Sequence, residues 1–269
     1  MIIFKSINRL NKEVNFKANI GFVPTMGALH KGHFSLIKSS KKKCKKTLVS
    51  IFVNPSQFNK KNDYKNYPRN LKRDIKILKI LKVDYLLIPK INEIYKNKKN
   101  MKIKLNKKDK ILCVKYRPGH FEGVLAIINQ FLINIKAKFM FLGEKDYQQI
   151  HLLKKFIKSK FKTKIIPCKT VRLNNSLAYS SRNFLLSKNE IQKASLISNS
   201  VRSFYLSIKK NFRNKNNINE IKKNIESKRI KVDYFELRNK KNLSKKIDKN
   251  NFKIFIAYYI NNIRLIDNF

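Results

Sequence analysis

The 269-residue sequence has no tryptophan, only six glycines and six prolines, and only 16 acidic side chains. Its three cysteines, Cys44, Cys113 and Cys168, are far apart and form no C-x-x-C pair, so neither a disulfide framework nor a zinc site is indicated. No segment approaches the ~18 uncharged residues of a membrane span, and residues 1–16 lack the apolar run of a signal peptide. We therefore expect reduced thiols, a cytoplasmic location and no membrane partner.

Basic residues greatly outnumber the acidic ones. There are 63 of them, 52 of which are lysine, and the formal net charge is +47. A nucleic-acid-binding protein usually gathers basic residues on one face and uses arginine for bidentate contacts. Here lysine is spread along the whole chain, which indicates compositional drift at solvated positions. We expect no specific nucleic-acid partner, although non-specific RNA binding beside another activity stays open.

Strand-like and helix-like segments alternate through the first two-thirds of the chain. Strands are predicted at residues 20–23, 48–53, 83–89, 139–142 and 165–167, and helices near His33, after Pro68, and over 121–135 and 147–161. This alternation is typical of an α/β fold with a doubly wound, Rossmann-like parallel sheet covered by helices on both faces. Ligands in such folds bind at the carboxyl ends of the strands.

The pattern changes from about residue 172. A long helix is predicted over residues 188–209, followed by a short helix and by strands at 232–237 and 252–260. Helices followed by strands indicate a smaller C-terminal α+β domain. We therefore predict one domain over residues 1–171 and another over residues 172–269, with a hinge in Asn174-Asn175-Ser176.

The strongest local signal is Met26-Gly27-Ala28-Leu29-His30-Lys31-Gly32-His33, between the first of these strands and a helix. The two glycines allow close approach of the backbone to a phosphate, and a helix N-terminus provides unpaired N–H groups and a positive dipole end. A P-loop would have Lys and Ser/Thr at His33 and Phe34, so a kinase-like site is not indicated. Two imidazoles can instead donate hydrogen bonds to phosphoryl oxygens. The alternatives are a packed histidine or a metal pair, and the latter lacks a nearby third ligand.

The run His30-Lys31-Gly32-His33 resembles the H-x-G-H signature of the nucleotidylyltransferase superfamily. Further segments resemble the pantothenate synthetase family in order and spacing: Pro24-Thr25-Met26-Gly27, Val53-Asn54-Pro55-Ser56-Gln57-Phe58, Tyr67-Pro68-Arg69, Arg117-Pro118-Gly119-His120-Phe121, Gly143-Glu144-Lys145-Asp146-Tyr147-Gln148-Gln149, Ser180-Ser181-Arg182-Asn183 and Arg264-Leu265-Ile266-Asp267-Asn268. The resemblance covers essentially the whole chain. Another H-x-G-H transferase would explain the nucleotide-binding motif but not the two glutamine motifs.

The resemblance implies an ATP-dependent ligase that condenses (R)-pantoate with β-alanine. A pantoyl-adenylate would form with release of diphosphate, and pantothenate would then form with release of AMP. Mg²⁺ would accompany ATP, no protein metal site is expected, and the family is generally homodimeric. A basic protein that has kept the fold but binds nucleic acid is a further alternative, which the retention of His30, His33, Lys145 and Arg182 disfavours.

The resemblance also implies a role for individual residues. His33, His30 and Lys145 would be catalytic. ATP would contact Met26, Gly27, Ala28, Leu29, His30, Lys31, Gly32, His33, Gly143, Glu144, Lys145, Asp146, Val171, Tyr179, Ser180, Ser181 and Arg182. Asn54, Gln57 and Gln149 would bind pantoate, and Gln57 would border the β-alanine site. The C-terminal domain would act as a lid that excludes water from the adenylate.

Some positions depart from the family pattern or stay open. Asp74 could help hold Mg²⁺ or be a solvated helix carboxylate. Cys113-Val114-Lys115-Tyr116 stands where an acidic residue and a glycine are common. Ser176 replaces part of an Asp-Gly turn, so it either takes a strained positive φ or changes the turn type. Lys96 replaces a proline. None of these removes a proposed substrate contact, so we expect a working enzyme.

Overall fold

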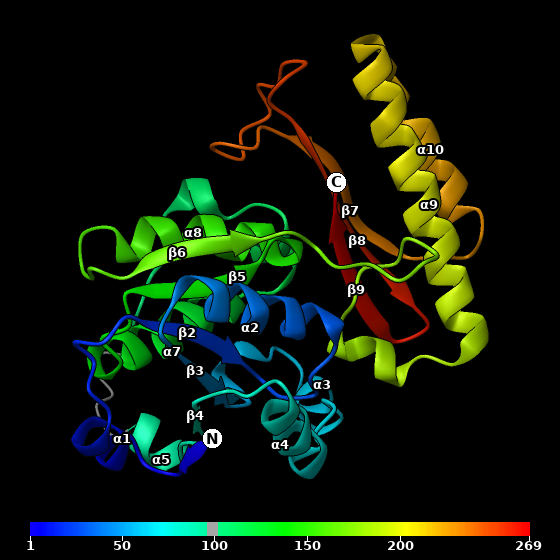
Figure 1. Cartoon of the computed structure of the whole chain (residues 1–269). Coiled ribbons are helices and arrows are strands. Elements are labelled where there is room, and N and C mark those ends of the chain that lie inside the picture. The colour runs from blue at the N-terminus through cyan, green and yellow to red at the C-terminus, as the bar shows by residue number, and fades with distance from the viewer. Residues whose placement is uncertain (96–101) are drawn as a thin grey trace. The chain divides into compact units, whose positions relative to one another are not determined.

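A computed structural model describes residues 1–95 and 102–269 of the chain. The predicted departure at Lys96 lies outside the described residues. The chain divides into two compact units (Figure 1). The first unit comprises Met1–Glu144 and Gln149–Lys169, and the second comprises Lys145–Gln148 and Thr170–Phe269. Each unit has its own sheet and its own apolar core.

The first unit is built around a six-stranded sheet in the order β1-β4-β3-β2-β5-β6, with every described pair parallel. Its strands are β1 (Ile2–Phe4), β2 (Ile20–Thr25), β3 (Lys46–Ile51), β4 (Tyr85–Leu87), β5 (Phe139–Gly143) and β6 (Lys164–Cys168). Helical segments along the same part of the chain are α1 (Ile7–Glu13), α2 (Lys31–Lys43), η1 (Pro55–Gln57), α3 (Lys61–Lys65), α4 (Leu71–Ile80), α5 (Ile91–Ile94), η3 (Lys107–Asp109), α6 (Cys113–Tyr116), α7 (His120–Asn134), η4 (Glu144–Asp146) and α8 (Tyr147–Ile157). Two boundaries between the units fall inside η4 and α8, and the third falls between Lys169 and Thr170. The predicted doubly wound parallel sheet is confirmed.

Helices cover both faces of this sheet (Figure 1). Neighbouring strand residues point to opposite faces, so Phe22 belongs to one buried cluster and Val23 to the other. The first cluster includes side chains of α1, α7 and α8, and the second includes those of α2 and α4. Two-sided burial explains why the strands appear as continuous apolar runs in the sequence.

The second unit has a three-stranded antiparallel sheet, β7 (Val232–Arg238), β8 (Lys253–Ile260) and β9 (Ile263–Asn268). Its helical segments are η5 (Ser181–Leu185), α9 (Lys188–Lys210), η6 (Phe212–Asn217) and α10 (Ile218–Glu226). Helix α9 begins at a capping box formed by Ser187 and Glu190. Its buried Ala194, Ile197 and Val201 belong to the same cluster as side chains of β8. The predicted smaller α+β part is confirmed, whereas the lid movement stays a prediction.

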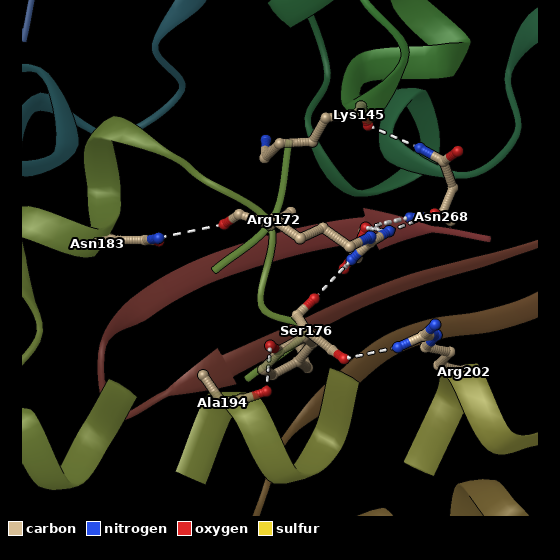
Figure 2. A network of polar contacts seen from close by, with 10 residues as sticks. Lys145, Arg172, Ser176, Asn183, Ala194, Arg202 and Asn268 are labelled. Carbon is tan, nitrogen blue, oxygen red and sulfur yellow. Dashed lines mark hydrogen bonds and ion pairs between the residues drawn. The ribbon is translucent and has the colours of Figure 1, made fainter. Parts of the chain in front are cut away.

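The turn at Ser176 keeps a left-handed backbone conformation, with φ +69°. Two arginines hold it, because Arg172 Nη1 donates to the Ser176 carbonyl (2.9 Å) and Arg202 Nη1 donates to Ser176 Oγ (3.3 Å; Figure 2). The stretch Cys113–Tyr116 forms the single helical turn α6 after Leu112, which has φ +50°. Both departures from the family pattern therefore fold into defined turns.

All three cysteines are buried and free of disulfides. Burial raises the pKa of the Cys44 and Cys168 thiols, which keeps them protonated at neutral pH. Among the residues that the structure describes, no helix is both long enough and apolar enough to cross a membrane.

Helix α4 ends in a Schellman motif centred on Lys82. The Lys82 N–H donates to the Lys79 carbonyl (2.9 Å), and the Val83 N–H donates to the Leu78 carbonyl (3.1 Å). Lys82 has φ +51°, a conformation that costs an L-residue free energy but that glycine adopts freely.

Lys82→Gly should therefore raise the free energy of unfolding by about 1 kcal/mol, measured by urea denaturation. Lys76→Gly is the matched control, because it removes the same charge from the exposed interior of the same helix. It should lower the free energy of unfolding by about 1 kcal/mol. Shifts of the same sign in both variants would contradict the assignment of the cost to the positive φ.

Candidate active site

Three of the predicted site segments follow adjacent strands. In the sheet, β2 lies between β3 and β5. The nucleotide loop, residues 26–33, follows β2, while Asn54 and Gln57 follow β3 and Gly143 ends β5. Because the strands are parallel, these segments lie at one edge of the sheet. Between β2 and β5 the strand order also changes direction, and this is where doubly wound folds bind ligands.

A buried carboxylate holds the nucleotide loop. Gly27 and Ala28 have φ values of +78° and +49°. Asp74 on α4 is 1% exposed, and its two oxygens accept the N–H groups of Ala28 and Leu29, both at 2.8 Å. Burial raises the pKa of Asp74, while the two N–H donors and Arg73 act in the opposite direction. The loop thus keeps a costly conformation because a carboxylate accepts its main-chain donors.

This geometry corrects the expectation for Asp74. The solvated alternative is wrong, because the side chain is buried. Each carboxylate oxygen already accepts an N–H from the loop, which gives no support to a magnesium ligand at this position. The sequence places Asp74 far from Ala28 and Leu29, so only the fold reveals this contact.

The two histidines of the loop cap helix α2. The His30 N–H donates to His33 Nδ1 (3.3 Å), the Gly32 N–H donates to His30 Nδ1 (3.1 Å), and the rings lie 4.0 Å apart. Since each Nδ1 is an acceptor, each neutral ring carries its proton on Nε2. The expectation of unpaired N–H groups here is wrong for His30 and Gly32, because the imidazoles accept them. A phosphate would instead meet Nε2–H donors at the positive end of the helix dipole.

Gln57 is buried in η1 beside the nucleotide loop. Its side-chain amide donates to Met26 Sδ. Its main-chain carbonyl lies 2.6 Å from His120 Nδ1 and accepts from Arg117 Nη2 (3.3 Å). Arg117 and His120 belong to a motif for which the sequence suggested no role. The structure shows that they hold the backbone of the Gln57 turn.

Asn54 connects this turn with α7. It is 1% exposed, its Nδ2 donates to the Gly123 carbonyl (3.0 Å), and its Oδ1 accepts from Ser56 Oγ (3.1 Å) and from the Tyr95 hydroxyl. These contacts fix the backbone between Asn54 and Gln57. The predicted contact of Asn54 with pantoate stays a prediction.

The remaining candidates divide between the two units. The first unit contains half-buried Gln149 on α8, half-buried Glu144, exposed Lys31, and Gly143, where a Cβ would meet no atom within 4 Å. The second unit contains Lys145, Asp146, Val171, Tyr179, Ser180, Ser181 and Arg182. Within that unit, the Tyr179 N–H donates to the Val171 carbonyl (3.0 Å), and Ser180 Oγ caps η5 by accepting the Arg182 N–H (3.3 Å).

The model of the family described as pantoate-beta-alanine ligase matches residues 2–269. The chain belongs to this family. A pantothenate synthetase of Francisella tularensis subsp. novicida is 42% identical over 274 residues, which cover 100% of this chain and 97% of the relative. The chain is therefore an ATP-dependent ligase that joins pantoate to β-alanine.

Solved structures agree with this assignment. A pantoate-beta-alanine ligase from Francisella tularensis, complexed with beta-gamma ATP and beta-alanine, is 39% identical with a TM-score of 0.87 and coverage of 100% of this chain and 97% of that chain. A pantothenate synthetase from Thermus thermophilus is 27% identical with a TM-score of 0.91 and coverage of 100% and 99%. Each of these two enzymes therefore shares its fold with this chain over nearly its whole length.

Asp74→Asn tests the support of the nucleotide loop. The asparagine offers one acceptor oxygen, and its amide nitrogen would face a main-chain N–H, so we expect about tenfold weaker ATP binding and about 1–3 kcal/mol lower stability. Calorimetric titration and urea denaturation measure the two effects. Glu13→Gln removes one negative charge from the surface of α1 and should change neither quantity by much. Unchanged ATP affinity in Asp74→Asn would show that the loop does not need the carboxylate.

Gly123→Ala tests how closely α7 must approach the Gln57 turn. A Cβ at this position would lie 2.5 Å from the Ser56 carbonyl oxygen and 2.9 Å from the Gln57 nitrogen, so the backbone would have to move. We expect the KM for pantoate to rise about tenfold, with a stability loss of about 1–3 kcal/mol. Gly21→Ala, whose Cβ would clash with Ser40 Oγ, should destabilise the sheet without changing this KM. Equal KM values in the two variants would refute the prediction.

Proposed function

We propose that the chain activates pantoate as a pantoyl-adenylate at the carboxyl ends of β2, β3 and β5. The observation that carries this proposal is the pairing of His30 and His33 at the N-terminus of α2, beside the strand-order reversal. A pantoate carboxylate oxygen attacks the α-phosphorus of ATP, and diphosphate leaves. The β-alanine amine then attacks the acyl carbon, the bond to AMP breaks, and the amine gives up a proton.

The imidazoles stabilise charge rather than act as nucleophiles. With Nδ1 occupied by main-chain N–H groups, each Nε2–H can donate to a phosphoryl oxygen. Charge accumulates on these oxygens as diphosphate leaves, and preorganised donors of this kind are worth a few kcal/mol. Asp74 keeps the donors in place because it fixes the preceding residues of the loop.

Other residues complete the substrate sites. Gly143 and Glu144 in the first unit, and Lys145, Asp146, Val171, Tyr179, Ser180, Ser181 and Arg182 in the second, would contact ATP. The lysine and arginine supply fixed positive charge for phosphate. Gln57 and Gln149 would bind pantoate through neutral amides, which suit a substrate with both hydroxyl and carboxylate groups. Asn54 would assist them, and Gln57 would also border β-alanine.

Magnesium enters this proposal as part of the substrate. Among residues 1–95 and 102–269, no group of three histidine, cysteine or acidic side chains could hold a metal ion. Mg²⁺ commonly binds through phosphate oxygens and water with few protein ligands. The ion would therefore arrive as Mg·ATP, and the residues named above would meet its phosphate oxygens.

The proposal includes the cellular setting predicted from the sequence. We propose a homodimer that works in the cytoplasm and has no specific nucleic-acid partner. Family membership supports the first two points, and the spread of lysine along the chain supports the third. A dimer of such cationic chains would bring positive surfaces together, so salt should favour its assembly.

His33→Ala should slow pantoate-dependent diphosphate release at least about 100-fold, because one preorganised donor is lost while the fold remains. The assay follows diphosphate and AMP from ATP, Mg²⁺ and pantoate, with and without β-alanine, on protein cleared of nucleic acid. His151→Gln, on α8, is the matched control and should keep normal turnover. Near-normal turnover in His33→Ala would remove this histidine from the mechanism. Absence of β-alanine-dependent AMP release from the folded parent chain would refute the ligase.

A further inference from the structure

Lys145 follows a strand of the first unit but belongs to the second unit. Asn268 Nδ2 donates to the Lys145 carbonyl at 2.8 Å. Two residues further on, the Tyr147 hydroxyl donates to the Lys240 carbonyl (2.8 Å), and the Tyr147 ring packs edge-on against Phe255. These contacts explain why Lys145–Gln148 groups with the C-terminal sheet.

Asn268 is the last residue of β9, and its main chain is itself held by two neighbouring side chains. The residue is 4% exposed, its N–H donates to Asp267 Oδ1 (2.8 Å), and its carbonyl accepts from Arg172 Nη2 (3.0 Å). Arg172 forms a bidentate ion pair with Asp267, at 2.6 and 2.9 Å. With both main-chain groups engaged, the Asn268 side chain has a defined direction toward Lys145, as Figure 2 shows.

We propose that Asn268 is a positioning residue that holds the main chain of Lys145 and thereby aims its ammonium group at the ATP phosphates. This inference rests on the role of Lys145 in the proposed function. The lysine side chain is 18% exposed, and its Nζ lies 3.5 Å from Asp146 Oδ1. Its four-carbon stem is flexible, so a fixed backbone limits the range of positions that the ammonium group can take.

The same network reaches other predicted ATP contacts. Arg172 directly follows Val171, and it pairs with Ala178 in a β-bridge that places Val171 beside Tyr179. The Arg172–Asp267 ion pair therefore joins the main chain of Lys145, through Asn268, to the segment that carries Ser180 and Arg182. This partly buried ion pair would therefore support the predicted ATP contacts of the second unit.

Asn268→Asp is the direct test, because it keeps the shape of the side chain but replaces the amide donor with a carboxylate oxygen facing the Lys145 carbonyl. We expect pantoate-dependent diphosphate release to slow about tenfold at saturating substrates, with an unchanged KM for β-alanine. Asn268→Ala gives a second variant if the aspartate prevents folding. Asn250→Asp, at an exposed position of the same unit, is the matched control and should leave the rate unchanged.

A double-mutant cycle with Lys145→Met separates positioning from general support of the fold. The rate of diphosphate release and the Kd of a non-hydrolysable ATP analogue are measured in both backgrounds. If Asn268 acts through Lys145, its substitution changes neither quantity further in the Lys145→Met background. Equal fold losses in the two backgrounds, or no loss in the parent background, overturn the proposal.

The cycle also distinguishes this inference from the proposed function. If Lys145→Met slows the reaction and weakens binding of the analogue but Asn268→Asp does neither, only the role of Asn268 fails. If Lys145→Met changes neither quantity, the predicted role of the lysine in ATP binding fails, and the proposal for Asn268 fails with it. AMP formation by the parent chain reports on the ligase activity in every case.

Discussion

The parallel pairing of β2 with β3 on one side and β5 on the other determines where the site of the first unit forms. This pairing places the segments after three strands at one edge of the sheet, although they are separated by many residues in the chain. The carboxyl end of β2 is the centre of this arrangement. Its loop must turn sharply to start α2, and the positive φ values of Gly27 and Ala28 are the result.

Strained turns in both units depend on charged side chains, a buried carboxylate in the first unit and a half-buried arginine in the second. In the first unit, Asp74 accepts the N–H groups of Ala28 and Leu29. In the second, Arg172 donates to the carbonyl of Ser176, whose φ is also positive. In each case a charged side chain pairs with main-chain groups of the turn, and Asp74 does so across 45 residues of sequence whereas Arg172 lies only four residues from Ser176. Predicted ATP contacts follow both turns along the chain, so we expect their positions to depend on these side chain to main chain contacts.

The sequence predicted the fold class and the longer elements because burial on two faces leaves continuous apolar runs, and amphipathic helices leave spacings of three and four. It did not indicate β1, which has three residues, or β9, where Arg264 and Asp267 interrupt the apolar pattern. These strands become regular only when a neighbouring strand pairs with them. Strand pairing across the sheet is a long-range property that local patterns do not contain.

The candidate site was predicted only as a set of residues. The roles of Asp74 and Asn268 depend on contacts with Ala28 and Lys145, which are distant in sequence, and no local pattern marks either contact. The imidazole capping of α2 is local, but it requires ring orientations that the H-x-G-H spacing alone does not specify. Backbone geometry was therefore the part of the site that the motifs left open.

The few carboxylates of this chain include several that accept main-chain N–H groups. Besides Asp74 and Asp267, Glu93 accepts the Ile7 N–H at the start of α1, and Asp84 accepts the Thr47 N–H in β3. A lysine at any of these positions would replace an acceptor with a donor and leave the N–H without a partner. Enrichment in lysine therefore has a physical limit in this fold. Exposed positions can change freely, whereas a residue whose side chain accepts a main-chain N–H can be exchanged only for another acceptor.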